Sequence, residues 1–141
     1  MKLTGLIFRK LAFALLGLLI PVSPLLAQYC LDIEIEGLRN DNGKLMIQLF
    51  DGDQKVVRQD TGTIYDQHCS VIFSGLMPGR YAVRYYHDEN ANMTMEINLV
   101  GKPMEGYGFS NNVTGKFGPP PFEKWLFTLD SDKKIILKPT Y

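Results

Sequence analysis

The sequence predicts an all-β protein: an antiparallel, immunoglobulin-like β-sandwich of about seven strands with one long ordered loop. Apolar and polar residues alternate with period two in several short segments, which is typical of strands with one buried face. Clusters of Gly, Asn, Asp and Pro separate these segments and favour turns. After the N-terminal segment, no helical period extends beyond two turns.

Residues 1–27 are expected to form a signal peptide. Basic residues precede an apolar run from Leu11 to Ile20, two prolines follow it, and cleavage is expected after Ala27. The alternative is an uncleaved anchor helix, but the run is shorter than the ~20 residues that a membrane span needs. We therefore expect a single domain, residues 28–141, that is periplasmic or secreted and has no stable membrane span after signal cleavage.

The charge of the expected domain argues against nucleic acid as a partner. The whole chain has 15 basic and 15 acidic residues, and the signal peptide contains three basic and no acidic ones. The domain therefore has 12 basic and 15 acidic residues, a net charge of −3. Phosphate binding requires clustered Lys and Arg instead.

The expected domain contains two cysteines, Cys30 and Cys69. An exported protein with two cysteines most simply forms one disulfide. Closing a loop of about 40 residues would stabilise the fold by roughly 3–4 kcal/mol. The alternatives are two free thiols, or a metal site that uses Cys69 and His68.

The first half of the domain predicts two strong strands and one weak one. Leu31–Glu36 and Lys44–Phe50 alternate apolar and polar residues and are separated by a turn at 40–43, so we expect a hairpin or close neighbours. Residues 55–64 are polar and mixed, which favours a short edge strand followed by a loop.

Four further strands are predicted. Cys69–Phe73 and Arg80–His87 alternate clearly and are separated by a Gly- and Pro-containing turn. Trp125–Leu129 and Lys134–Lys138 are two short strands that residues 130–133 should join as a hairpin.

Residues 88–122 form the expected long loop. Loops of this length in compact domains are usually functional or disordered. This one contains aromatic and apolar residues that favour a packed loop: Tyr107, Phe109, Phe117, Phe122, Met95, Leu99 and Val100. Its Pro-rich end is stiff.

Three stretches carry a family resemblance: GLMPGRYAVRYYHDENAN, GKPMEGYGFSNN and FGPPPFEKWLF. Residues 30–141 resemble the bacterial family called domain of unknown function 2141. The resemblance implies an exported β-sandwich without an established activity. The Leu-x-Pro-Gly-x-Tyr strand start is also similar to transthyretin-like and carboxypeptidase-regulatory modules, which are mostly non-catalytic. The chain departs from the family's usual Asp-Glu-Asn-Gly-Asn-Gly-x-x-Asp, since Ala91 and Met93 replace the two glycines and Glu96 replaces the last acid.

The first candidate site is a calcium loop. Asp88, Asn90, Asn92 and Glu96 lie at alternating positions, which resembles the start of a calcium-binding loop. Met93 stands where that loop has glycine, and leucine stands where its bidentate glutamate would be. The alternative is an Asx-rich turn whose side chains satisfy their own backbone.

The second candidate is a zinc or copper site, or a metal-dependent enzyme, built on His87 with Asp88 and Glu89. A closed metal site needs more ligands, and a catalytic base needs an oriented partner and a nucleophile. No catalytic set is therefore named.

The third candidate is a ligand-binding loop for a small molecule, a glycan or a protein. Its residues are polar or aromatic and come from the first two stretches quoted above: His87, Glu89, Glu105, Tyr107, Phe109, Ser110, Asn111 and Asn112. The alternative is that the aromatic residues fill the end of the sandwich and that the glycines serve close packing or positive φ. The preferred interpretation is a non-enzymatic binding or structural module that displays residues 88–122.

Overall fold

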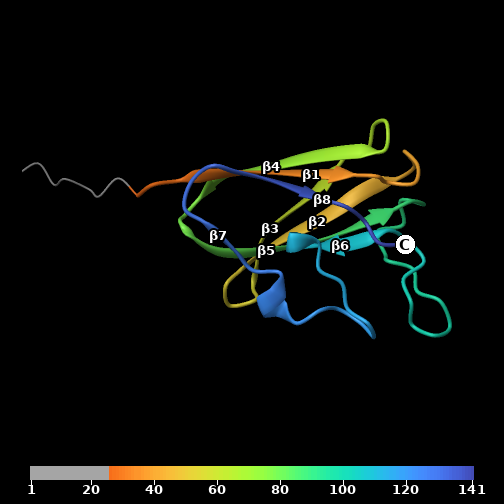
Figure 1. Ribbon diagram of the computed structural model, residues 1–141. Coiled ribbons are helices and arrows are strands. Elements are labelled where there is room, and N and C mark those ends of the chain that lie inside the picture. The colour runs from red at the N-terminus through yellow and green to blue at the C-terminus, as the bar shows by residue number, and fades with distance from the viewer. Residues whose placement is uncertain (1–25) are drawn as a thin grey trace, which may run out of the picture.

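The computed structural model describes residues 26–141, which form two packed β-sheets (Figure 1). The three-stranded sheet has the order β4-β1-β8, formed by His68–Leu76, Tyr29–Glu36 and Lys133–Leu137. The five-stranded sheet has the order β3-β2-β5-β6, formed by Val56–Gly62, Lys44–Asp51, Gly79–Asp88 and Tyr107–Phe109. Its fifth strand, β7 (Phe127–Leu129), pairs with the start of β5. Two short 3-10 helices complete the fold, η1 (Ser110–Asn112) and η2 (Phe122–Lys124).

The predicted β-sandwich is confirmed, and its core follows from the alternation. The apolar positions of β1 and β2 are buried and belong to one cluster between the sheets: Leu31, Ile33, Ile35, Leu45, Ile47 and Leu49. Fully burying such a side chain stabilises the fold by about 1.5–3 kcal/mol. The buried residues of both hydrophobic clusters lie between Leu31 and Leu137, so residues 28–141 contain the whole described core.

Two of the predicted strand pairings are wrong. β1 and β2 lie in different sheets, and β1 pairs instead with β4 and β8. β7 pairs with β5, whereas β8 crosses to the other sheet and pairs in parallel with β1. The alternation of a strand reveals its buried face but not its neighbour, because two strands that face each other across a core show the same pattern as two that lie side by side.

The predicted disulfide is also wrong, because Cys30 and Cys69 are both free. Cys30 lies near the start of β1, whereas Cys69 lies opposite Ile35, five residues further along that strand. Five residues of a strand span about 17 Å, whereas the Cα atoms of a disulfide lie roughly 4.4–6.8 Å apart. The antiparallel pairing of β1 with β4 therefore keeps the two thiols apart.

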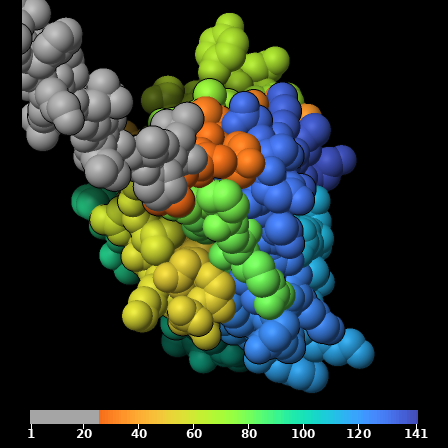
Figure 2. Space-filling view, turned by 90° about the vertical axis from the view of Figure 1, so that its left-hand side faces the viewer, coloured from red at the N-terminus to blue at the C-terminus, as the bar shows by residue number. Residues whose placement is uncertain are grey.

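The expected edge strand at 55–64 is confirmed as β3. The predicted strand Trp125–Leu129 is shorter, since only Phe127–Leu129 is extended and Trp125 follows η2. Figure 2 looks onto the end of the sandwich where β5 begins. There the turn after β4 (green) lies beside the segment that contains β7 (blue), in agreement with the pairing of β5 with β7.

The long loop is interrupted by β6 and η1 and packs only in part. Phe109 and Trp125 form a second cluster with Phe50 on the outer side of the five-stranded sheet, with ring centroids 4.2 Å apart for Phe109 and Trp125. Leu99, Val100 and Phe117, by contrast, are exposed, so the expectation that they pack is wrong.

The predicted signal peptide lies almost entirely outside the described residues. Within residues 26–141, no helix is long and apolar enough to span a membrane.

Candidate functional site

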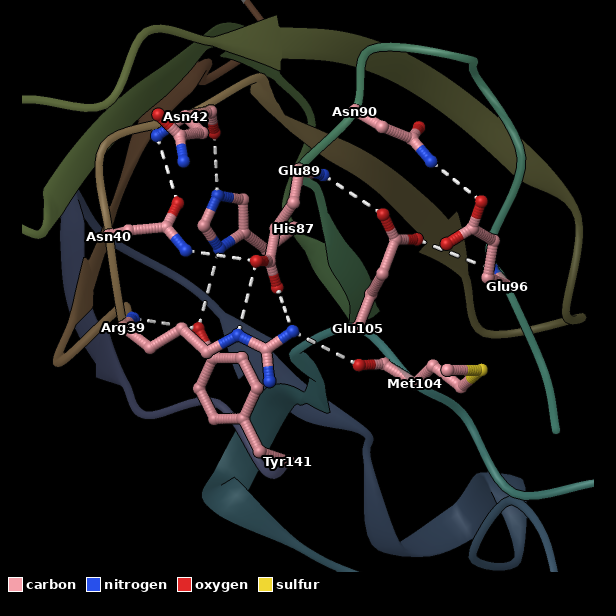
Figure 3. A network of polar contacts seen from close by, with 10 residues as sticks. All are labelled: Arg39, Asn40, Asn42, His87, Glu89, Asn90, Glu96, Met104, Glu105 and Tyr141. Atoms are coloured by element: carbon pink, nitrogen blue, oxygen red, sulfur yellow. Dashed lines mark hydrogen bonds and ion pairs between the residues drawn. The ribbon is translucent and has the colours of Figure 1, made fainter.

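A polar network closes the end of the sandwich where β5 stops (Figure 3). At its centre, His87 is fully buried. Its Nε2 lies 2.7 Å from the carbonyl oxygen of Asn42, and its Nδ1 lies 3.3 Å from the hydroxyl of Tyr141. The imidazole therefore fastens the turn before β2 and the C-terminal segment to β5, and both of its nitrogens are engaged.

Glu89 is held by a cation and an amide. Arg39 contacts both carboxylate oxygens, with Nη2 at 2.6 Å and Nε at 3.1 Å, and the Asn40 amide donates at 2.9 Å. Partial burial alone would raise the pKa of Glu89, but the hydrogen bonds from Arg39 and Asn40 and the charge of Arg39 together lower it. Glu89 therefore serves as an anchor for the segment 39–40.

Glu105 closes the base of the loop that runs from residue 89 to residue 105. Its buried carboxylate accepts hydrogen bonds from the backbone N–H groups of Glu89 and Glu96, at 2.9 and 3.3 Å. Arg39 adds a bond from Nη2 to the carbonyl oxygen of Met104 at 3.2 Å. Both ends of this loop are therefore fixed to the same cluster of side chains.

Asp88, Asn90, Asn92 and Glu96 do lie together, as the calcium prediction requires, but they bond to one another. The two carboxylate oxygens of Asp88 accept the backbone N–H groups of Asn92 and Met93, at 3.0 and 2.8 Å. The amides of Asn90 and Asn92 both donate to Oε1 of Glu96. This is the geometry of an Asx-rich turn.

A cation at this turn would have to displace those donors. Across residues 26–141, no three side chains of His, Cys, Asp or Glu are grouped in a way that could hold a metal ion. The calcium site remains a prediction.

The turn places Ala91 and Met93 in the left-handed backbone region, with φ of 56° and 64°. L-residues adopt this region at a cost of roughly 1–2 kcal/mol, whereas glycine adopts it freely. The family pattern that places glycine at both positions therefore fits the backbone of this turn, and this chain departs from it under strain.

The stretch from Gly106 to Asn112 serves internal packing. A Cβ atom at Gly106 would overlap the ring of Tyr141, and one at Gly108 would overlap the hydroxyl end of Tyr85. Neither glycine has positive φ, so close approach alone requires them.

The three polar residues after Phe109 link other segments of the chain. The Ser110 hydroxyl accepts the N–H of Val83 and donates to the carbonyl oxygen of Trp125. The Asn111 amide donates to the carbonyl oxygens of Lys124 and Leu126. Asn112 bonds to Ile136 in β8 and to Lys138, which follows that strand. These expected ligand-loop residues therefore hold η1 against the body of the fold.

A concave surface lies beside this network, on the outer face of the five-stranded sheet. An open groove of about 1320 Å³ runs between two loop segments, residues 93–103 and residues 114–119. Its floor consists of outward-facing side chains from β2, β3, β5 and β6: Met46, Gln48, Gln59, Thr61, Arg84, Tyr86 and Tyr107. Of the predicted ligand-loop residues, only Tyr107 and Phe109 line it.

The groove residues that sequence reasoning missed are Met46, Gln48 and Arg84 on β2 and β5. Arg84 donates to the side-chain oxygen of Gln48 at 2.5 Å and lies over the ring of Phe50, 5.4 Å from its centroid. A signal was present, since the outward positions of these strands hold Met, Gln, Arg and Tyr. Without the strand order, the sequence could not show that these positions share one face.

The comparisons with known proteins identify a family without an assigned role. The family described as "Uncharacterized protein conserved in bacteria (DUF2141)" matches residues 33–136, which is 104 of the 141 residues. No curated protein and no solved structure matches the chain. The sequence resemblance is thereby confirmed, and the chain belongs to the bacterial DUF2141 family.

Proposed function

We propose that this protein is an exported, non-enzymatic binding module that takes an elongated amphipathic ligand with an acidic group in the groove above the five-stranded sheet. The groove carries this proposal: about 1320 Å³ of open space with a sheet as its floor and a loop segment on each side. Ligand sites are concave and largely preformed, with apolar walls and a few convergent polar groups.

The apolar part of the ligand would lie against thioethers and aromatic rings. Met46, Met93 and Met95 line the groove together with Tyr86 and Tyr107. Methionine side chains are flexible and polarisable, which suits a surface that must adapt to an apolar ligand. Tyrosine adds apolar area together with a hydroxyl that can bond a polar group.

The acidic group of the ligand would meet Arg84. Across the described residues Arg84 forms no ion pair, and its guanidinium lies on the groove floor beside Gln48. Among the lining side chains, Arg84, Lys102 and Lys116 are basic, and only Asp60 is acidic. A guanidinium can bond a carboxylate or phosphate through two parallel N–H groups.

The polar network favours a structural role, in which it holds one wall of the groove in place, over a catalytic role. His87, Asp88 and Glu105 are buried, and their polar atoms bond to the chain itself. They hold the loop whose residues 93–103 border the groove. A preformed wall lowers the entropy that binding must overcome.

Isothermal calorimetry on residues 28–141 tests this proposal with two amphiphiles below their micelle concentrations, decanoate and octyl glucoside. We expect both to bind with one-to-one stoichiometry. Arg84→Gln should weaken decanoate about tenfold, which corresponds to ~1.4 kcal/mol, and leave octyl glucoside unchanged.

The matched control is Arg58→Gln, because Arg58 is an exposed arginine on β3 that does not line the groove. It should leave both affinities unchanged. The proposal is wrong if neither amphiphile binds the wild-type protein, or if the two arginine variants lose decanoate affinity equally.

A further inference from the structure

The two loop segments beside the groove end in exposed apolar tips. The first tip, residues 97–103, presents Leu99 at 107% and Val100 at 86% relative exposure. The second tip, residues 114–119, presents Phe117 at 103%. Large apolar side chains that are this exposed and clustered on loops mark an interaction surface.

The first tip is a closed turn that holds its apolar residues outward. Asn98 donates its N–H to the carbonyl oxygen of Lys102 at 2.8 Å and accepts the N–H of Gly101 at 2.9 Å. The Asn98 side-chain oxygen accepts two more backbone N–H groups, from Val100 at 3.0 Å and Lys102 at 2.9 Å. The backbone N–H groups of Asn98, Val100, Gly101 and Lys102 are thus bonded within the tip, which lowers the cost of removing it from water.

The second tip is also tightly turned. A Cβ atom at Gly115 would overlap the backbone of Gly118, so the chain folds back closely on itself around Phe117. Prolines 119–121 follow and stiffen the return. In Figure 1, both segments project to the same side of the molecule, below the five-stranded sheet, and they border one groove.

The charge of both tips is positive. Lys102 lies in the first tip and Lys116 in the second, and neither segment contains an acidic residue. The expected domain as a whole has 12 basic and 15 acidic residues, so the tips are positively charged on a domain whose net charge is negative. Basic residues beside exposed apolar ones are what the surface of an anionic membrane attracts.

We propose that the two tips insert into the surface of an anionic lipid membrane and hold the groove against the lipid headgroups. Leu99, Val100 and Phe117 would enter the boundary between headgroups and acyl chains, and Lys102 and Lys116 would contact lipid phosphates. A stable protein partner would instead need a continuous surface of about 800 Å². Two small tips separated by an open groove fit a soft lipid surface better than a protein of fixed shape.

Vesicle co-sedimentation tests this inference directly. Residues 28–141 would be mixed with vesicles of phosphatidylcholine alone and of phosphatidylcholine with phosphatidylglycerol. We expect the wild-type protein to bind the anionic vesicles at least tenfold more tightly than the neutral ones. The double variant Leu99→Asp with Phe117→Asp should lose at least tenfold in affinity for the anionic vesicles.

The matched control is Ile72→Asp with Tyr65→Asp, since both residues are exposed but lie away from the groove. This variant should bind like the wild-type protein, and circular dichroism would verify that both double variants are folded. If the tip variant does not fold, Leu99→Ser with Phe117→Ser replaces it. Arg84→Gln should keep vesicle binding, which separates this inference from ligand binding in the groove.

Three results would overturn the inference. The wild-type protein could remain in the supernatant with both kinds of vesicle, and self-association in that case would point to a protein interface. The tip and control variants could lose affinity equally. Finally, Lys102→Gln with Lys116→Gln could leave the preference for anionic vesicles unchanged.

Discussion

The hydroxyl of Tyr141 accepts a hydrogen bond from the backbone N–H of Arg39 at 2.9 Å, across 102 positions of sequence. The guanidinium of the same arginine lies over the tyrosine ring, 4.7 Å from its centroid. Tyr141 also contacts His87, and the adjacent Thr140 exchanges two backbone hydrogen bonds with Tyr107. The C-terminal segment thereby fastens β6 to the polar network.

Removing the Tyr141 side chain should therefore destabilise the whole fold. We expect Tyr141→Ala to lower the free energy of unfolding by about 2 kcal/mol, from a lost hydrogen bond, a lost cation–π contact and lost packing over Gly106. The melting temperature should fall by roughly 6–10 °C in a calorimetric scan. Tyr65→Ala, at a tyrosine that is 82% exposed, is the control and should shift it little. Equal shifts would show that the C-terminal contacts add no stability.

Glycine at positions 91 and 93 should stabilise the protein. Both residues have positive φ, so Ala91→Gly and Met93→Gly relieve backbone strain, although glycine also gains entropy in the unfolded chain. We expect a net gain of about 0.5–1 kcal/mol for each, measured by urea unfolding.

Asn90→Gly is the control, because Asn90 lacks positive φ and its amide bonds Glu96. Asn90→Gly should lower the free energy of unfolding. A loss of stability in both test variants would contradict the proposed strain.

The stability of the fold should depend on the ionisation of Glu89. Its pKa in the folded protein lies below the ordinary value of 4.5, so its contribution is fully present above that value and is lost as the pH falls through the lowered pKa. Glu89→Gln should cost about 1–2 kcal/mol at neutral pH, because it leaves Arg39 without its counter-charge.

Urea unfolding between pH 7 and pH 3 measures this dependence. Below about pH 4.5, the free energy of unfolding of the wild-type protein should fall more steeply with decreasing pH than that of Glu89→Gln. Parallel curves would show that the Arg39–Glu89 pair does not carry the effect.

The two cysteines should behave as separate thiols. Cys30 is exposed, whereas burial raises the pKa of the Cys69 thiol to about 11, with a further contribution from the charge of Asp60. Because the thiolate is the reactive form, iodoacetamide should label Cys30 in the native protein and Cys69 only after unfolding. Mass spectrometry without reductant should then find one added group in the native protein and two in the unfolded protein. No labelling after unfolding would mean that a disulfide exists.

The elements of the fold were more predictable than their arrangement. The segments around Leu31–Glu36, Lys44–Phe50 and Arg80–His87 each became a strand with its apolar side buried, because alternation directly encodes a buried face. Alternation does not encode which strand is the neighbour. The hairpin or close pairing expected across 40–43 and the hairpin expected at 130–133 are therefore wrong. The disulfide is wrong as well, because the number of cysteines does not show whether the fold brings them together.

The candidate site was predicted in location but not in detail. The polar residues from His87 to Glu105 do gather at one end of the sheet, yet most of them bond to the chain itself. The groove lies beside them, on the outer face of the five-stranded sheet. Its floor includes side chains such as Arg84 and Met46 that are far apart in sequence. Their proximity depends on the pairing of β2 with β5, which no local pattern specifies.

The location of the ligand tests the central claim most directly. A ¹H–¹⁵N correlation spectrum of residues 28–141, titrated with decanoate, would report which backbone amides change. We predict that the shifts concentrate at Met46, Arg84, Tyr86 and Tyr107 and in residues 93–103, while Asp32, Ile72 and Ile136 on the three-stranded sheet stay unchanged. Shifts confined to the three-stranded sheet, or none at saturating decanoate, would contradict the assignment of the groove as the binding site.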